Sequence, residues 1–196
     1  MMKFRYLLLI IAIVLSVSAL SFADQVITFE GYPSYTVFTN QYPGVDFNGA
    51  TVLTLGESLN PSFPPHSGIN VVYNPVGPMS IDFASPVGYF SGYFTYNSGL
   101  TVQAYDSLSN LLGTYNSLCT ANYIGSGTGC GPNELGIVTA PGIVRVLITG
   151  GSGNNFTLDD AEFTGSVNSV PEPGTLLMFG SGFLGLAGVL RRKINP

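Results

Sequence analysis

Acid–base chemistry has few candidates in the central part of this chain, residues 24–169. His66 is the only histidine in the sequence, and a Ser-His-Asp triad would need it as the general base. It stands in the proline-rich segment Asn60–Gly68, with no G-x-S-x-G nucleophile pattern near it. We therefore expect His66 to be a solvated loop histidine and not a catalytic base.

Carboxylates are numerous, because ten of the eleven acidic residues lie between residues 24 and 169. A glycosidase needs two carboxylates at a fixed separation, and ten acidic residues allow too many pairs to single one out. A secreted hydrolase acting on polysaccharide therefore remains the alternative to a non-enzymatic protein. Glu30 ends the first predicted strand, and Asp159 and Asp160 lie in the last one. Their oxygens are of the hard type that Ca²⁺ prefers.

Aromatic side chains give a second candidate chemistry, which is weak carbohydrate binding. Sugars stack on exposed aromatic faces while polar groups fix their hydroxyls. Tyr32, Tyr35 and Tyr42 fall in predicted loops, and Tyr123 lies between the two cysteines, but the chain has no tryptophan. Three tyrosines on predicted strands are expected to be half-buried in sheet packing: Tyr89, Tyr93 and Tyr105.

The two cysteines, Cys119 and Cys130, lie in the glycine-rich segment Ser117–Glu134, which is predicted to be a loop. If this part of the chain is exported to an oxidising compartment, they form a disulfide. Closing a loop of this size is worth about 2–3 kcal/mol. A metal pair is the alternative, although no histidine or further cysteine lies nearby.

These residues must be positioned by a β-rich scaffold, because no long helical periodicity occurs between residues 24 and 169. Short runs of alternating apolar and polar residues are separated by Gly, Pro, Asn and Ser, a pattern typical of an all-β sandwich. Ile143–Thr149 is almost all β-branched or Leu, which predicts a central strand. The other predicted strands are Val26–Glu30, Thr51–Leu55, Ile69–Tyr73, Met79–Phe83, Val87–Tyr96 (broken by Gly88 and Gly92), Leu100–Tyr105, Asn110–Tyr115 and Phe156–Phe163.

Charge excludes one class of partner for this domain. Residues 24–169 hold ten acidic residues and one basic residue, Arg145, which gives a formal charge of −9. A surface this acidic repels phosphate backbones, so nucleic-acid binding is excluded. Cation binding or solubility outside the cell fits the charge better.

The N-terminus has the layout of a secretory signal peptide, residues 1–23. Lys3 and Arg5 precede the apolar run Leu7–Leu15, and Ser21-Phe22-Ala23 forms a small-x-small cleavage site. We expect signal peptidase to cut between Ala23 and Asp24. A permanent N-terminal membrane helix is the alternative.

The C-terminal segment, residues 170–196, has three parts. Two prolines hold an extended, protease-accessible hinge, Val170-Pro171-Glu172-Pro173. Residues 174–190 are uncharged, and as a helix they would measure roughly 25 Å, close to the thickness of a bilayer's hydrocarbon core. Arg191, Arg192 and Lys193 then form a basic stop that stays cytoplasmic by the positive-inside rule. A buried helix of a soluble domain and a permanent, unprocessed anchor are the alternatives.

This three-part end resembles the PEP-CTERM sorting signal of Gram-negative bacteria. The resemblance implies that a membrane-embedded exosortase recognises the Pro-Glu-Pro motif and removes or exchanges the tail. It also implies an exported protein, anchored in the inner membrane during sorting, then placed on the cell surface or in an exopolysaccharide matrix. The chain would be a substrate of the processing enzyme.

The middle domain resembles the extracellular domain common in PEP-CTERM proteins, which is similar to the galactose-binding-like jelly roll of carbohydrate-binding modules. The resemblance is carried by Ile81-Asp82-Phe83 with Pro86-Val87, Thr101–Asp106, Leu135-Gly136-Ile137 and Phe156–Phe163. In such jelly rolls the first and last strands are neighbours, and a carboxylate from each often helps to hold Ca²⁺. The resemblance therefore implies Glu30 and Asp159 as ligands of a structural calcium ion, with Asp160 next.

Together these observations predict an all-β antiparallel sandwich of jelly-roll type, residues 24–169, between an N-terminal signal helix and a C-terminal transmembrane helix. The predicted function is that of an exported, non-enzymatic surface or matrix protein with weak glycan contact. No catalytic residue and no cofactor besides calcium is predicted.

Overall fold

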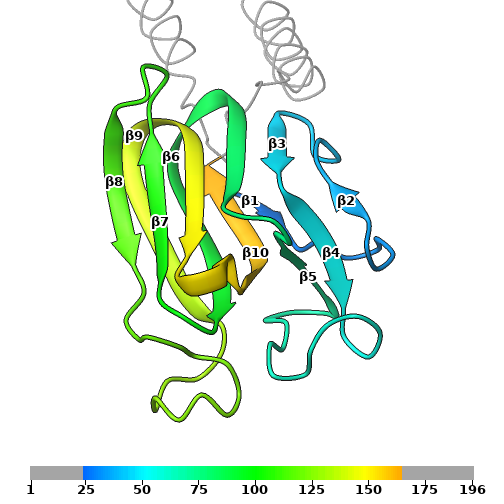
Figure 1. Ribbon diagram of the computed structural model, residues 1–196. Helices are drawn as coiled ribbons and strands as arrows, with labels where there is room; N and C mark the ends of the chain where they lie inside the picture. The colour runs from blue at the N-terminus through cyan, green and yellow to red at the C-terminus, as the bar shows by residue number, and fades with distance from the viewer. Residues whose placement is uncertain (1–23, 165–196) are drawn as a thin grey trace, which may run out of the picture. The chain divides into compact units, whose positions relative to one another are not determined.

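The computed structural model describes residues 24–164, which lie within one compact unit, Ala23–Ser166. The predicted all-β antiparallel fold is confirmed for these residues (Figure 1). They contain no helix long and apolar enough to cross a membrane. The predicted signal and transmembrane helices lie outside the described residues. The elements are β1 (Asp24–Ile27), β2 (Val37–Phe38), β3 (Val45–Asn48), β4 (Ala50–Thr54), β5 (Asn70–Tyr73), β6 (Met79–Tyr96), β7 (Leu100–Tyr105), β8 (Leu111–Asn116), β9 (Glu134–Gly150), the 3₁₀ helix η1 (Ser152–Asn154) and β10 (Phe156–Thr164).

Two long strands, β6 and β9, connect the parts of the sandwich. They pair with each other in two stretches, and the register shifts between Asp82 and Val87 and again before Tyr89. The first stretch of β6 also pairs with β3, and its second stretch pairs with β10. The last residues of β9 pair with β7, which pairs in turn with β8. The strands thus form one continuous set of ladders around one core, in the order β2-β4-β5-β10-β6-β9-β7-β8.

Alternation along the strands explains which side chains fill this core. In β4 and β7 every second residue is buried, as expected for strands with one face on the core and one towards solvent. The ring of Phe38 lies 5.1–6.0 Å from four other aromatic rings, those of Phe29, Tyr32, Tyr42 and Phe47. This cluster fixes the short strand β2, which pairs with β4 through only two residues.

Three features of the strand pattern differ from the sequence-based prediction. Neither Gly88 nor Gly92 divides β6: the irregularity at Gly88 is taken up as a register shift between Val87 and Tyr89, and Gly92 pairs with Gly136 without any shift. Strand β9 begins at Glu134, so the predicted central strand Ile143–Thr149 is only its second half. Strands β2 and β3 were not predicted, since turn residues surround both and each is very short.

Candidate functional site

The loop between β4 and β5 is held from both sides by carboxylates. Oε1 of Glu30 accepts hydrogen bonds from the backbone N–H groups of Ile69 and Asn70, at 2.9 and 2.8 Å. Oδ2 of Asp159 accepts those of His66 and Ser67, at 2.7 and 2.9 Å. A carboxylate that accepts backbone N–H groups makes charge-assisted bonds, roughly twice as strong as neutral ones. The chain therefore fixes residues 66–70 against β10 and the turn that follows β1. Glu30 lies in this turn and not at the end of the first strand as predicted, because β1 already ends at Ile27.

The three residues predicted to bind calcium are the ones that hold this loop. The first and last strands, β1 and β10, pair with each other. Oε1 of Glu30 and both oxygens of Asp159 accept N–H donors that a cation bound there would have to displace. No group of three or more His, Cys, Asp or Glu side chains that could hold a metal ion occurs among residues 24–164. Calcium binding by these carboxylates stays a prediction, and a titration that tests it is described below.

A bulge in β10 explains why two successive aspartates reach the same loop. Asp159 pairs with Tyr93 and Glu162 with Ser91, so β10 has one residue more than β6 between these pairs. Asp160 sits in this bulge with a left-handed backbone, φ 44°. Its Oδ1 accepts the Ser67 hydroxyl at 2.8 Å, and its Oδ2 lies 2.7 Å from Nδ1 of His66.

His66 is a partly exposed histidine that packs on an aromatic ring. Its ring stacks on that of Tyr93, with 3.4 Å between centroids and 6° between planes. Asp160 contacts His66 as the acid of a catalytic dyad would, but the Ser67 hydroxyl donates to Asp160 and not to the imidazole. His66 therefore does not activate Ser67 in this arrangement.

Burial distinguishes Asp159 from the other carboxylates of this loop. Its side chain is 1% exposed. Burial, assisted by the nearby Asp160 carboxylate, raises the pKa of Asp159 to about 6, against the lowering effect of the backbone N–H donors. Asp159 thus titrates close to neutral pH.

The cysteine loop, residues 117–133, is closed by a disulfide and is anchored to the sheet at two further points. Cys119 and Cys130 form the predicted disulfide. Asn122, which is fully buried, accepts the backbone N–H of Tyr96 at 2.7 Å and donates from Nδ2 to the carbonyl of Phe94 at 2.8 Å. The Asn122 amide thus makes the hydrogen bonds that the backbone of a neighbouring strand would make at the end of β6. It thereby holds the position of the next residue, Tyr123.

A second anchor of this loop is a carboxylate shared by two tyrosines. The Tyr96 hydroxyl donates to Glu134 Oε2 at 2.5 Å, and the Tyr115 hydroxyl donates to Oε1 of the same carboxylate. The backbone N–H of Leu118 also donates to Oε1, at 2.8 Å. Burial raises the pKa of Tyr96 to about 12 and also raises that of Tyr115. Both phenols therefore remain neutral donors at physiological pH.

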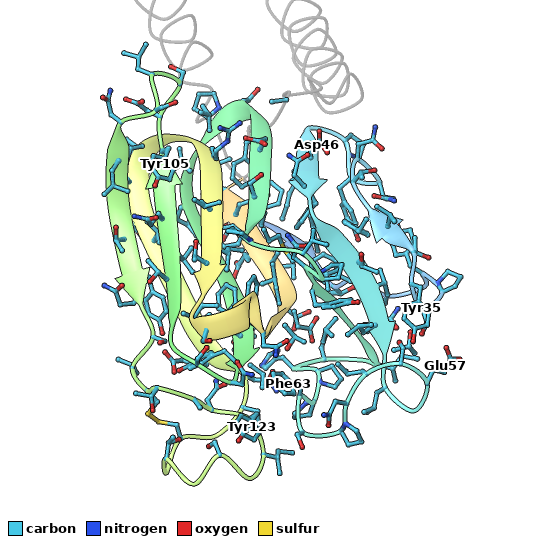
Figure 2. All side chains as sticks on the ribbon, in the orientation of Figure 1. Tyr35, Asp46, Glu57, Phe63, Tyr105 and Tyr123 are labelled. Carbon is cyan, nitrogen blue, oxygen red and sulfur yellow. A yellow bond between two sulfur atoms is a disulfide. The ribbon has the colours of Figure 1, made fainter. Side chains whose placement is uncertain are left out.

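The two loops meet, and their aromatic side chains form one wall of a groove. The rings of Phe63 and Tyr123 are parallel within 5°, with centroids 5.8 Å apart (Figure 2). The backbone N–H of Ile124 donates to the carbonyl of Ser62 at 2.9 Å, which joins the loops beside these rings. The groove has a volume of about 440 Å³ and is lined by Leu53, Ser58, Leu59, Asn60, Ser62, Phe63, Tyr73, Asn97, Tyr123, Asn155, Phe156 and Thr157.

Polar groups in the groove remain available to a ligand. Within residues 24–164, the side-chain amide nitrogens of Asn60, Asn97 and Asn155 donate to no protein acceptor. All three residues are exposed, whereas Phe63, Tyr73 and Tyr123 are half-buried. The combination of aromatic faces and free amides suits a ring that carries hydroxyl groups.

Of the four loop tyrosines predicted to contact sugar, only Tyr123 lines this groove. Tyr32 and Tyr42 pack on Phe38, and Tyr35 is 67% exposed elsewhere on the surface. The prediction missed Phe63, Tyr73 and the three asparagines. Phe63 carried a usable signal, since it is an aromatic residue between prolines in an otherwise polar loop.

The end of the chain matches a known family model. Residues 169–193 match the PEP-CTERM protein-sorting motif. The chain carries a PEP-CTERM sorting signal. The match confirms the resemblance predicted from the sequence, and the motif indicates an exported protein that an exosortase processes. Val170–Pro173, the segment 174–190, the basic stop at Arg191–Lys193 and the cleavage residue Ala23 all lie outside the described residues, whereas Asp24 is the first residue of β1.

Distant structural similarities occur for the folded part of the chain. No curated protein matches the sequence. A DUF4465 family protein from Bacteroides caccae is 13% identical, with a TM-score of 0.45 over 72% of this chain and 98% of its own. A module from Clostridium stercorarium, CsCBM6-3 in complex with cellobiose, is 14% identical, with a TM-score of 0.36 over 73% and 93%.

A partial similarity to an enzyme also occurs. The catalytic domain of a GH87 α-1,3-glucanase is 19% identical, with a TM-score of 0.41 over 78% of this chain but only 30% of its own. Since all these TM-scores are below 0.5, we base no conclusion about the function of this protein on them.

Proposed function

We propose that this PEP-CTERM protein is a non-enzymatic component of the cell surface or exopolysaccharide matrix, which binds a hydroxyl-rich glycan in the groove between its two long loops. The sorting signal supports export, and the groove supports the glycan. The observation that carries the proposal is the parallel pair Phe63–Tyr123, which lies beside three asparagines whose side-chain nitrogens donate to no acceptor within residues 24–164.

The direction of the chain also favours this use of the groove. Asn155 and Phe156 line the groove at the start of β10, and the strand ends at Thr164, from which the chain continues to the sorting signal. Eight residue steps along a strand span roughly 26 Å. The groove therefore lies at the end of the domain opposite Thr164, the last described residue before the sorting signal.

The way the acidic residues are used supports the non-enzymatic part of the proposal. Glu30 and Asp159 are engaged by backbone N–H groups, and Asp160 is engaged by His66 and Ser67. None of them lines the groove. A hydrolase would need a carboxylate pair on either side of a bound sugar. A carboxylate-dependent hydrolysis of any polysaccharide by the purified protein would favour the alternative, a secreted hydrolase.

Affinity electrophoresis tests the groove. The full-length chain, in a detergent without a sugar headgroup, is run in gels with and without hydroxyethyl cellulose, galactomannan or alginate. We expect retardation by a neutral polysaccharide, weakened about 3- to 10-fold by Tyr123→Ala, since an aromatic contact contributes about 0.5–1.5 kcal/mol. Tyr35→Ala is the matched control and should run like the wild type. Absence of any retardation of the wild type would overturn the proposal.

Intact-mass spectrometry tests the sorting. We expect the mature protein to begin at Asp24 and to lack the segment that follows the Pro-Glu-Pro motif when an exosortase is present. Glu172→Ala should leave the tail uncut. A mature protein with the whole tail in the presence of the exosortase would instead identify a permanent anchor.

A further inference from the structure

A second hollow lies on the solvent face of the sheet formed by β3, β6, β9 and β7. Its volume is about 490 Å³. Its floor contains a row of residues that are direct cross-strand partners: Asp82 pairs with Arg145, and Arg145 pairs with Tyr105. Partners at one register share a face of the sheet, so these side chains lie side by side. A second row, Asn48–Ser80–Leu147, runs parallel to the first, two residues farther along each strand.

The ion pair in this row retains unused hydrogen-bonding capacity. Nε of Arg145 donates to Oδ1 of Asp82 at 2.6 Å, and the Asn48 amide donates to Oδ2 at 3.0 Å. Within residues 24–164 the two terminal nitrogens of the Arg145 guanidinium have no acceptor, and its side chain is 53% exposed. An exposed ion pair adds little to the free energy of unfolding. Stability alone therefore does not explain why Asp82, Arg145 and Tyr105 lie side by side.

The rim of the hollow is rigid. Both oxygens of Asp106 are used within the turn between β7 and β8, where they accept the backbone N–H groups of Leu108 and Asn110 and the Asn110 side-chain amide. The hydrogen bonds from Asn110 lower the pKa of Asp106, which stays ionised. This turn presents Ser107 and Ser109 to the hollow, and their hydroxyls have no partner in the described part of the chain.

We propose that this hollow is a second glycan subsite, which takes a neutral, hydroxyl-rich sugar segment on Arg145, Asp82 and Tyr105. Adjacent donor and acceptor groups, Arg145 and Asp82, match two neighbouring sugar hydroxyls, each of which can donate and accept. The Tyr105 ring offers a stacking face beside them. A polyanionic glycan is disfavoured, because Asp46, Asp82 and Asp106 lie around the single cation and the domain carries a formal charge of −9.

Two subsites would make the protein a cross-linker of glycan chains. This inference rests on the proposed function of the Phe63–Tyr123 groove. Tyr105 is at one end of β7 (Figure 2). Asn97, which lines the groove, precedes the other end of this strand, Leu100. Five residue steps span roughly 17 Å, so the sites are too far apart to be parts of one pocket. Two separate glycan chains can thus occupy them at once.

The test compares three variants of the full-length chain in the gels described above, together with turbidity of a mixture with the retarding neutral polysaccharide. The first variant combines Arg145→Gln with Tyr105→Ala, the second combines Phe63→Ala with Tyr123→Ala, and the third carries all four changes. We expect the first and second to retain part of the retardation but to lose the turbidity that cross-linking causes. The third should lose both, while Tyr35→Ala keeps both. A melting temperature equal to that of the wild type shows that each variant is folded.

The outcomes separate the two sites. If the Arg145/Tyr105 variant equals the wild type in retardation and turbidity, or if the Phe63/Tyr123 variant loses all retardation, the second subsite is overturned and the groove stands. If only the Arg145/Tyr105 variant loses retardation, the groove is overturned and the second subsite stands. Retardation of the wild type by alginate alone, dependent on Arg145, would overturn the assignment to a neutral glycan. Failure of every polysaccharide to retard the wild type would overturn both sites.

Discussion

Oδ2 of Asp159 accepts the backbone N–H of Ser67 at 2.9 Å, although 92 residues separate them in the chain. The same oxygen accepts the N–H of His66, and Oδ1 accepts that of Asp160. One buried carboxylate therefore holds the loop before β5 against the bulge of β10. The two aspartates predicted as calcium ligands from the sequence thus have a clear structural use.

Asp159→Ala should loosen this loop. It leaves three backbone N–H groups without their acceptor, and each unsatisfied buried donor costs about 1–3 kcal/mol. We expect the amide hydrogens of His66 and Ser67 to exchange at least about tenfold faster, with a lower melting temperature. Asp46→Ala, which removes an exposed carboxylate with no hydrogen-bond partner in the described residues, is the control. Unchanged exchange at Ser67 would show that the loop is held by other contacts.

The raised pKa of Asp159 makes stability depend on pH in a definite direction. The folded protein holds a proton on Asp159 up to about pH 6, whereas the unfolded chain releases it near pH 4. The contribution of this residue to the free energy of unfolding is therefore greatest below about pH 4. It falls as the pH rises through the window from 4 to 6, by an amount of order 2–3 kcal/mol.

This pH dependence can be measured against a variant that does not titrate. The melting temperature of the wild type should rise relative to that of Asp159→Asn when the pH is lowered from 7 to 4. A carboxyl-carbon NMR titration of Asp159 should have its midpoint near pH 6. A midpoint near 4 would contradict the prediction.

Asn122→Ala should destabilise the domain and move Tyr123. It removes the acceptor of the buried N–H of Tyr96 and the side-chain donor to the carbonyl of Phe94, at a cost of about 2–4 kcal/mol in total. For a domain of this size that corresponds to a fall in melting temperature of roughly 4–15 °C. Asn40→Ala, an exposed asparagine, should change the melting temperature very little. Retardation by glycan as strong as in the wild type would show that the other contacts of the loop are enough to position Tyr123.

The calcium hypothesis predicts a measurable stabilisation. An ion that binds only the folded state raises the free energy of unfolding by about 2.7 kcal/mol at a concentration 100 times its dissociation constant. Millimolar Ca²⁺ should therefore raise the melting temperature, EDTA should reverse the change, and Glu30→Gln should remove it. A melting temperature that responds to neither Ca²⁺ nor EDTA would mean that Glu30 and Asp159 only hold the loop.

The sequence by itself determined the fold class, the sorting signal and the disulfide. Alternation of apolar and polar residues is a local property, and β4 and β7 follow it in the structure within a residue of the prediction. The tail is recognisable because its three parts are contiguous in the chain, and the family model matches it at 169–193. Two cysteines in an exported chain leave a single intramolecular pairing, the one observed.

Only the tertiary structure decided where a ligand could bind. The groove brings Phe63 and Tyr123 together from two loops, and the second hollow aligns Asp82, Arg145 and Tyr105 from three strands. Neither set is close in sequence, because strand register and loop packing arise from contacts between distant segments, which no local pattern encodes. The bulge that turns Asp160 towards His66 arises because β10 has one residue more than β6 at this point. The extra residue can be recognised only from the pairing of β10 with β6.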